Sequence, residues 1–273
     1  MSTPALSLRD VSINRAETEV VHGVSLDVAP AGITVLLGAN GAGKTTLMDG
    51  IAGLVRTTSG TVALDGTPID RLPTHRRAGA GLAYVEQART VFRTLTVEQN
   101  LLVAEHGDGD LGAAYRLFPE LEKRRTLQAG HLSGGEQQML VLGRALVARP
   151  RTVLIDEMSS GLAPVVVHRL MRAVAGLADL GIAVLLIEQF AHLALEIGTR
   201  AYVLAKGRIV FDGRCADLRG DADRLHDFYF GTTGTTGTTG TTGTTGTTGT
   251  TGTPAAAGAP RSQGLGPAES EGA

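Results

Sequence analysis

Short apolar runs alternate with helical patterns along most of the chain. Each run has four or five consecutive residues rich in Val, Leu, Ile or Ala, as expected of buried strands. The runs are TVLL (34–37), TVAL (61–64), GLAYV (81–85), TVLI (152–155) and AVLLI (183–187). We therefore expect an α/β fold with a largely parallel sheet.

The segment after Pro164 has a clear helical pattern. Proline suits the first turn of a helix, because its missing N–H would have no partner there. Apolar side chains then recur at spacings of three and four residues, at Val167, Leu170, Met171, Val174 and Leu177. We expect this stripe to pack on the sheet.

Strand signals stop between residues 95 and 132. Thr96 and Gln99 have the spacing of a capping box, and NLLVAEH (100–106) and AAYRLFPELEKRR (113–125) have the pattern of helices. We expect a helical insertion at about residues 88–132.

The composition changes at Gly231. Seven consecutive Gly-Thr-Thr triplets begin there, and Pro, Ala, Ser and Gly dominate the remainder. Glycine at every third position is typical of collagen, but too few prolines are present to enforce that helix. We expect one folded domain at residues 1–230 and a disordered tail at 231–273.

Charge and cysteine content exclude several functional classes. The formal net charge is −2 and no block of Lys or Arg stands out, so we expect no nucleic-acid partner. Cys215 is the single cysteine and the seven histidines lack metal-ligand spacing, which favours a reducing compartment without a zinc site.

The first residues do not resemble a signal peptide and the apolar runs are too short to cross a bilayer. A membrane role would therefore depend on docking.

GANGAGKTT (38–46) fits the phosphate-loop pattern G-x-x-x-x-G-K-[ST] at Gly38, Gly43, Lys44 and Thr45. It follows one predicted strand and opens a predicted helix, TTLMDGIAGL, which is the expected context. Backbone N–H groups would surround phosphates, Lys44 would reach the β- and γ-phosphates, and the Thr45 hydroxyl would help to bind Mg²⁺. The alternative is a glycine-rich structural turn. No Asn-Lys-x-Asp guanine motif is present, so ATP is favoured over GTP.

TVLIDE (152–157) places two acidic residues at the carboxyl end of a buried strand, where open α/β sheets bind ligands. Asp156 would hold Mg²⁺ directly or through water. Glu157 would orient or deprotonate an attacking water. The alternative is an acidic strand end that caps the next element.

HLSGGEQQML (131–140) combines a capping box, Ser133 and Glu136, with two glycines. A capping box does not require glycine, and each helical glycine costs about 1 kcal/mol relative to alanine. We infer that another group approaches this backbone closely.

The phosphate loop, Gln87 after a strand, LSGGEQQ and LIDE occur in an order that resembles the ATP-binding cassette of ABC transporters, over residues 6 to about 230. The resemblance implies a P-loop NTPase fold with an antiparallel β-subdomain beside the parallel sheet and a helical insertion. It also implies two cassettes that meet head to tail. Residues 133–135, here called the signature segment, would then contact ATP held by the partner's phosphate loop.

The resemblance assigns roles to further residues. Glu157, Gln189 and Gln87 would be catalytic, and Thr45, Gln87 and Asp156 would bind Mg²⁺. The nucleotide site would consist of Arg15, Gly38, Asn40, Gly41, Gly43, Lys44, Thr45, Thr46, Ser133, Gly134 and Gly135.

Several motifs, including GLAYVEQARTVFRTLTVEQNLL, LFPELEKRR, GRALVARP and SSGLAP, look like the second ATPase subunit of branched-chain amino-acid importers. Related machines carry urea or short amides. The resemblance implies two integral-membrane permeases, a second ATPase subunit that is identical or different, and an extracellular substrate-binding protein. The chain would lie on the cytoplasmic face of the membrane, where Phe92 and Leu95 would receive a short permease helix.

Three residues depart from the family pattern. Arg15 stands where an aromatic residue usually stacks on adenine; a guanidinium can stack but offers less apolar area. Gln189 replaces the usual switch histidine, and its amide can donate a hydrogen bond but cannot become cationic. Met158 replaces the proline that usually follows the catalytic acid.

Two other functions are consistent with these motifs. One is a catalytically weak nucleotide-binding subunit that completes a partner's ATP site; Glu157 favours the active ATPase. The other is an ABC ATPase of translation or DNA repair, which would be expected to have tandem cassettes, a long coiled coil or basic arms. None of these three features is found in the sequence.

Overall fold

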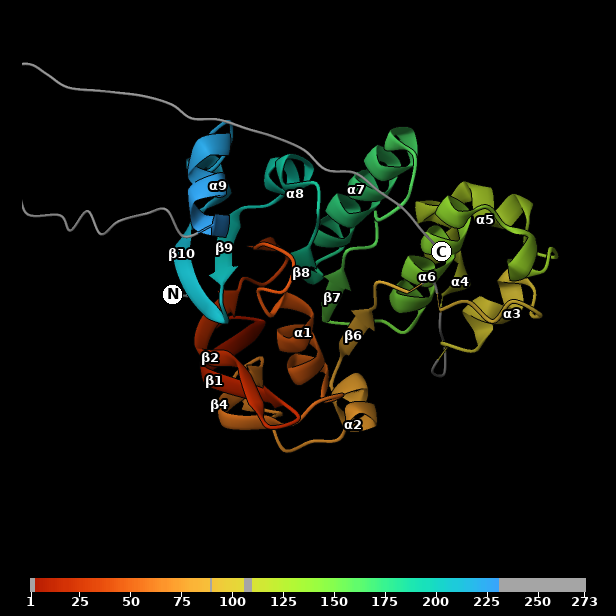
Figure 1. The fold of residues 1–273 in the computed structure, drawn as a ribbon. Coiled ribbons are helices and arrows are strands. Elements are labelled where there is room, and N and C mark those ends of the chain that lie inside the picture. Colours follow the sequence, from red (N-terminus) through yellow and green to blue (C-terminus); the bar gives the residue numbers. More distant parts are fainter. Residues whose placement is uncertain (1–2, 89, 106–109, 231–273) are drawn as a thin grey trace, which may run out of the picture. The chain divides into compact units, whose positions relative to one another are not determined.

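The computed structural model describes residues 3–88, 90–105 and 110–230 (Figure 1). The predicted tail at 231–273 lies outside these residues. Six strands form the central sheet in the order β10-β9-β3-β8-β7-β6. They are β3 (Ile33–Leu37), β6 (Leu82–Val85), β7 (Thr152–Asp156), β8 (Ala183–Ile187), β9 (Arg200–Ala205) and β10 (Arg208–Arg214). Every neighbouring pair is parallel except β9 and β10. The predicted α/β fold with a largely parallel sheet is confirmed.

The central strands are buried on both faces, which explains their continuous apolar runs. All five residues of β3, β7 and β8 are buried. Their side chains alternate between two cores: Val153 and Ile155 pack in one, and Leu154 packs in the other. Layers of other elements must therefore cover both faces of the sheet.

A second, antiparallel sheet contributes to one of these layers. Its strands are β1 (Leu6–Arg15), β2 (Thr18–Val28), β4 (Thr57–Leu64) and β5 (Thr67–Pro68), in the order β2-β1-β4-β5. The run TVAL lies in β4, and the antiparallel sheet expected beside the parallel one is confirmed. A short apolar run shows burial, but it does not show which strand it pairs with.

Helices complete the two layers (Figure 1). On one face, α1 (Lys44–Ala52) packs between the central sheet and the antiparallel sheet. On the other face lie α6 (Gly134–Val147), α7 (Pro164–Asp179) and α8 (Ala191–Ile197). The predicted stripe of α7 is confirmed, because all five of its apolar residues are buried. The remaining helices include α2 (Thr74–Gly79) and α9 (Ala222–Phe230).

Short helices occupy the region of the predicted insertion: α3 (Val97–Leu102), α4 (Leu111–Leu117), α5 (Pro119–Lys123) and the 3₁₀ turn η1 (Ala129–His131). The capping box of Thr96 and Gln99 is present. The single helix expected at 113–125 is broken at Phe118, because the residue before a proline is disfavoured in helical conformation. The helix expected at 100–106 already ends at Leu102, and His106 lies outside the described residues. None of the described helices is both long and apolar enough to cross a bilayer.

Candidate functional site

The loop between β3 and α1 is shaped by glycines. A Cβ at Gly38 would lie 2.3 Å from the Leu204 carbonyl oxygen, and one at Gly43 would lie 3.2 Å from the Val20 carbonyl oxygen. Gly43 is also the N-cap of α1, with φ 105°, and supplies no side-chain cap. The backbone N–H groups at this helix start are thus free of a capping side chain, an arrangement that suits phosphate.

Lys44 places its charge inside the loop. Its side chain is 7% exposed, and Nζ donates to the carbonyl oxygens of Gly38 (2.9 Å) and Ala39 (3.2 Å). Nζ also lies 3.6 Å from Glu157 Oε1. The ammonium group is therefore close both to the loop that would bind phosphates and to Glu157, the proposed catalytic base.

Asp156 ends β7 as a buried carboxylate. Its Oδ2 is 3.4 Å from the Tyr84 hydroxyl, whereas its Oδ1 has no hydrogen-bond partner among the described residues. Burial raises the pKa of Asp156, and the nearby Thr45 side chain partly opposes this rise. A buried carboxylate oxygen without a partner, next to a hydroxyl, fits an oxygen-coordinated divalent cation.

Glu157 and Gln87 form a hydrogen bond beside the phosphate loop. Gln87 Nε2 donates to Glu157 Oε2 at 3.1 Å. Glu157 has a left-handed backbone with φ 44°, which costs about 1 kcal/mol for a residue other than glycine. Its N–H donates to the Ile187 carbonyl oxygen at 2.9 Å and fixes this turn. A cavity of about 410 Å³ is lined by Val20, Asn40, Gly41, Gly43, Lys44, Thr45, Thr46, Gln87 and Glu157.

Arg15 and Gln189 lie outside this cavity lining. Arg15 forms an ion pair with Asp49 through Nη2, and its Nε is 3.4 Å from Thr46 Oγ1. Gln189 is exposed and lies two residues after the end of β8. The structure thus brings Arg15 near the start of α1 but turns its guanidinium towards Asp49.

The signature segment also lies apart from the cavity, at the start of α6. The predicted capping box is present: Ser133 Oγ accepts from the Glu136 N–H at 3.3 Å, and the Ser133 N–H donates to Glu136 Oε2 at 2.9 Å. A Cβ at Gly135 would lie 2.4 Å from Val166 Cγ1 of α7. The group that approaches this glycine within the chain is therefore a valine of the next helix.

Sequence reasoning missed Tyr84, which contacts Asp156, and Asp49, which contacts Tyr84. Tyr84 lies within the apolar run of β6, and Asp49 lies in α1. The polar hydroxyl inside an apolar strand was a signal for Tyr84, because a buried phenol usually has a hydrogen-bond partner. The sequence contained no comparable signal for Asp49.

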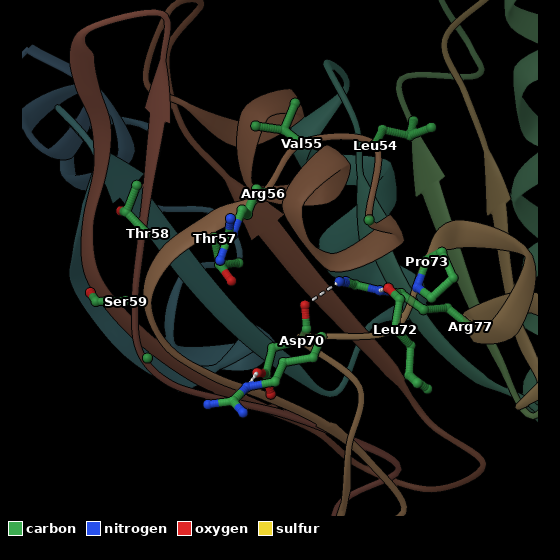
Figure 2. A pocket seen from close by; sticks show the side chains of 13 residues that line it. Leu54, Val55, Arg56, Thr57, Thr58, Ser59, Asp70, Leu72, Pro73 and Arg77 are labelled. Carbon is green, nitrogen blue, oxygen red and sulfur yellow. Dashed lines mark hydrogen bonds and ion pairs between the residues drawn. The ribbon is translucent and has the colours of Figure 1, made fainter.

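A larger cavity, of about 700 Å³, lies elsewhere, beside the end of α1 (Figure 2). The Arg77 guanidinium at its edge donates to four backbone carbonyl oxygens, those of Gly50, Ile51, Asp70 and Leu72. Because its donors form hydrogen bonds with backbone carbonyl groups, Arg77 links the end of α1 to the segment before α2.

Residues 21–160 match the family model described as ABC transporter. The chain belongs to the ABC transporter family. The predicted family is thereby confirmed, as is its ATPase class.

Two relatives in this family have names that refer to amino-acid transport. The chain is 38% identical to the high-affinity branched-chain amino acid transport ATP-binding protein BraG of Pseudomonas aeruginosa, over 83% of this chain and 99% of the relative. It is 39% identical to the probable branched-chain amino acid transport ATP-binding protein LivF of Archaeoglobus fulgidus, over 77% of this chain and 93% of the relative. It is also 32% identical to the lipopolysaccharide export system ATP-binding protein LptB of Haemophilus influenzae, over 83% and 97%.

Solved structures of ABC cassettes share the fold. One is a cassette in its ADP conformation, with a TM-score of 0.75 and 25% identity over 84% of this chain and 100% of that chain. Another is a nucleotide-free cassette, with a TM-score of 0.73 and 24% identity over 82% and 98%. The fold of the ABC cassette is therefore shown by the structure as well as by the sequence.

Proposed function

We propose that this chain is the ATP-hydrolysing subunit of an importer for branched-chain amino acids or related small amides. The contact between Gln87, Glu157 and Lys44 supports an active ATPase, because it assembles a candidate base beside the phosphate loop. The similarity to BraG and LivF supports branched-chain amino acids as the cargo. Lipopolysaccharide export is the second candidate, because LptB is also similar over most of both chains.

ATP would bind with its phosphates in the loop at 38–43 and with Lys44 on the β- and γ-phosphates. Thr45, Asp156 and Gln87 would hold Mg²⁺, which when bound neutralises charge on the phosphates. The buried, unpartnered Oδ1 of Asp156 fits this role. Glycine at positions 38 and 43 lets the loop pass close to the carbonyl oxygens of Leu204 and Val20.

Glu157 would orient and deprotonate the attacking water, with Gln87 holding its carboxylate in place. Gln189, which is exposed after β8, would donate a hydrogen bond to the γ-phosphate. The signature segment, which lies outside the cavity of its own chain, would complete the site of a second ATPase subunit. This assembly would place one ATP between each loop and the partner's α6.

Permease subunits would bind at the insertion, on the cytoplasmic face of the membrane, and a substrate-binding protein would act from outside. Phe92 is 45% exposed and carries the Arg144 guanidinium 4.9 Å above its ring. Leu95 is partly buried beside it. An exposed aromatic ring held in this way suits a short apolar helix.

The first test replaces Glu157 with glutamine. Glu157→Gln should abolish ATP hydrolysis and leave ATP binding intact, because it removes the base but preserves size and hydrogen bonding. Turnover by phosphate release and ATP affinity by fluorescence titration measure the two effects. Lys44→Ala is the matched comparison and should instead weaken ATP binding itself. Undiminished turnover in Glu157→Gln would reject Glu157 as the base.

The cargo is tested with the assembled transporter. Hydrolysis should rise when the associated receptor is loaded with leucine, isoleucine or valine, or with a small amide. A lipopolysaccharide-dependent rise without any response to these solutes would support export instead.

A further inference from the structure

Tyr84 lies between the carboxylates of two acidic residues. Its hydroxyl oxygen is 3.3 Å from Asp49 Oδ1 and 3.4 Å from Asp156 Oδ2. A phenol has one hydrogen, so it can donate to only one carboxylate at a time. Phenols are protonated at neutral pH, so the Tyr84 hydroxyl carries this hydrogen.

The two oxygens of Asp156 have different surroundings. Tyr84 contacts Oδ2, and Oδ1 has no hydrogen-bond partner in the part of the chain that the structure describes. The residue is 1% exposed, so water does not orient it freely. A ligating carboxylate is aimed by the bond to its second oxygen, and loss of such a bond typically lowers metal affinity roughly 10- to 100-fold.

The contacts continue from Tyr84 towards Arg15. Asp49 forms an ion pair with Arg15 through its other oxygen, Oδ2. The Asp49 side chain is 14% exposed, and that of Arg15 is 45% exposed. The ion pair therefore holds the Asp49 carboxylate of α1 in place as the second acceptor for the Tyr84 hydroxyl.

We propose that Tyr84 is a positioning residue for Asp156: its hydroxyl holds Oδ2 and leaves Oδ1 as the oxygen that would bind the divalent cation. This inference rests on the proposed function, because it requires Asp156 to bind the cation that accompanies ATP. Tyr84 does not line the cavity beside the phosphate loop. Its effect is on metal affinity and not on the affinity for nucleotide alone.

A purely structural role for Tyr84 makes a different prediction. Its ring packs at the edge of the core formed by α1 and the two sheets. If only this packing mattered, removal of the hydroxyl would leave metal binding unchanged. Tyr84→Phe separates the two roles, because it keeps the ring and removes the hydroxyl.

The experiment uses the full-length chain with saturating ATP and Mn²⁺ as a spectroscopic probe, since free Mn²⁺ is counted directly by electron paramagnetic resonance. Tyr84→Phe should weaken Mn²⁺ binding about tenfold. ATP affinity measured in EDTA should change less than twofold. In turnover assays, the Mg²⁺ concentration at half-maximal rate should rise while the rate at saturating Mg²⁺ approaches that of the wild type.

Tyr115→Phe is the matched control, because the Tyr115 hydroxyl is buried without a partner among the described residues. It should leave Mn²⁺ binding unchanged. Wild-type Mn²⁺ affinity in Tyr84→Phe would overturn the positioning role alone. An equal loss of metal-free ATP affinity would also overturn it, in favour of a packing role. If the wild-type chain bound ATP without recruiting Mn²⁺, the proposed metal site would fail, and this inference with it.

Discussion

Glu188 is a buried carboxyl group that joins two loops of the proposed site. It is 4% exposed and precedes Gln189, and one of its oxygens accepts a hydrogen bond from Ser159, two residues after Glu157. Its other oxygen has no partner in the described part of the chain. Burial raises the pKa of Glu188 from 4.5 to about 7, partly opposed by the bond from Ser159.

This raised pKa predicts a loss of stability with increasing pH. The unfolded chain ionises Glu188 near pH 4.5 and the folded chain only near pH 7. The folded state is therefore progressively penalised between these values, and above pH 7 the penalty is constant at about 3 kcal/mol. Glu188→Gln should raise the melting temperature much more at pH 8 than at pH 5. Calorimetry checks this, with the exposed Glu196→Gln as control; an equal change at both pH values would contradict it.

Arg77 is a second buried residue that can carry charge, and hydrogen bonds to backbone carbonyl groups stabilise it. It is 3% exposed, and each of its four bonds to backbone carbonyl oxygens is between 2.7 and 2.8 Å long. Burial lowers the pKa of Arg77, partly opposed by Asp70. Because these carbonyls belong to the end of α1 and the segment before α2, the guanidinium substitutes for missing backbone partners.

Arg77→Met should therefore destabilise the chain by about 3 kcal/mol, since it leaves several carbonyl groups without a donor. Arg71→Met is the matched control: the Arg71 side chain is 98% exposed, so its replacement should change stability by less than about 0.5 kcal/mol. Urea unfolding measures both. If Arg77→Met were as stable as the unaltered chain, water would replace the guanidinium as the donor to these carbonyl groups.

The start of α6 is packed directly against α7. Gly135 leaves room for the Val166 side chain, which a Cβ would meet at 2.4 Å. Valine is stiff about χ1 and cannot easily turn away. Gly135→Ala should thus displace the two helices and cost about 2 kcal/mol.

The double variant Gly135→Ala/Val166→Ala should recover most of this stability in urea unfolding. Gly79→Ala, at a helical glycine with nothing within 4 Å, should be neutral or stabilising. A double variant that folds normally but does not hydrolyse ATP would show that Gly135 also serves the nucleotide. Failure of Val166→Ala to restore stability would contradict the packing explanation.

Local patterns could be predicted from the sequence because the interacting groups are close along the chain. The capping boxes at Thr96 and Ser133 each join residues three apart, and both are present. The stripe of α7 follows one helical period. The break at Phe118 was equally local, but the strong apolar pattern on both sides of Pro119 concealed it.

Contacts between distant segments could not be predicted in the same way. Arg15 and Asp49 are 34 residues apart, and Tyr84 and Asp156 are 72 residues apart. The pairing of β6 with β7 brings Tyr84 near Asp156, and the packing of α1 against β1 brings Asp49 near Arg15. The phosphate loop and the acidic strand end were recognisable because each is a short motif with its own chemistry, whereas Tyr84 and Asp49 are not.

The complete proposed site requires two chains, and the prediction is clearest for a heterodimer. The signature segment and the phosphate loop of one chain lie in separate places. Ser133→Arg should place a large cation where the partner's phosphate must sit. Vanadate trapping of nucleotide should then persist on this chain's Lys44 and disappear on the partner chain. Trapping lost only on this chain would show instead that the signature serves its own loop.

For a homodimer, two inactive variants should complement each other. Ser133→Arg chains retain an intact phosphate loop, and Lys44→Ala chains retain an intact signature segment, so a mixed dimer contains one intact composite site. Each variant alone should fail to hydrolyse ATP, because both of its sites contain a damaged half. Mixing equal amounts should restore phosphate release in proportion to the mixed dimers, which two different affinity tags would count. If mixed dimers formed and remained inactive, catalysis would not be shared between chains, and Ser133 would serve only to cap α6.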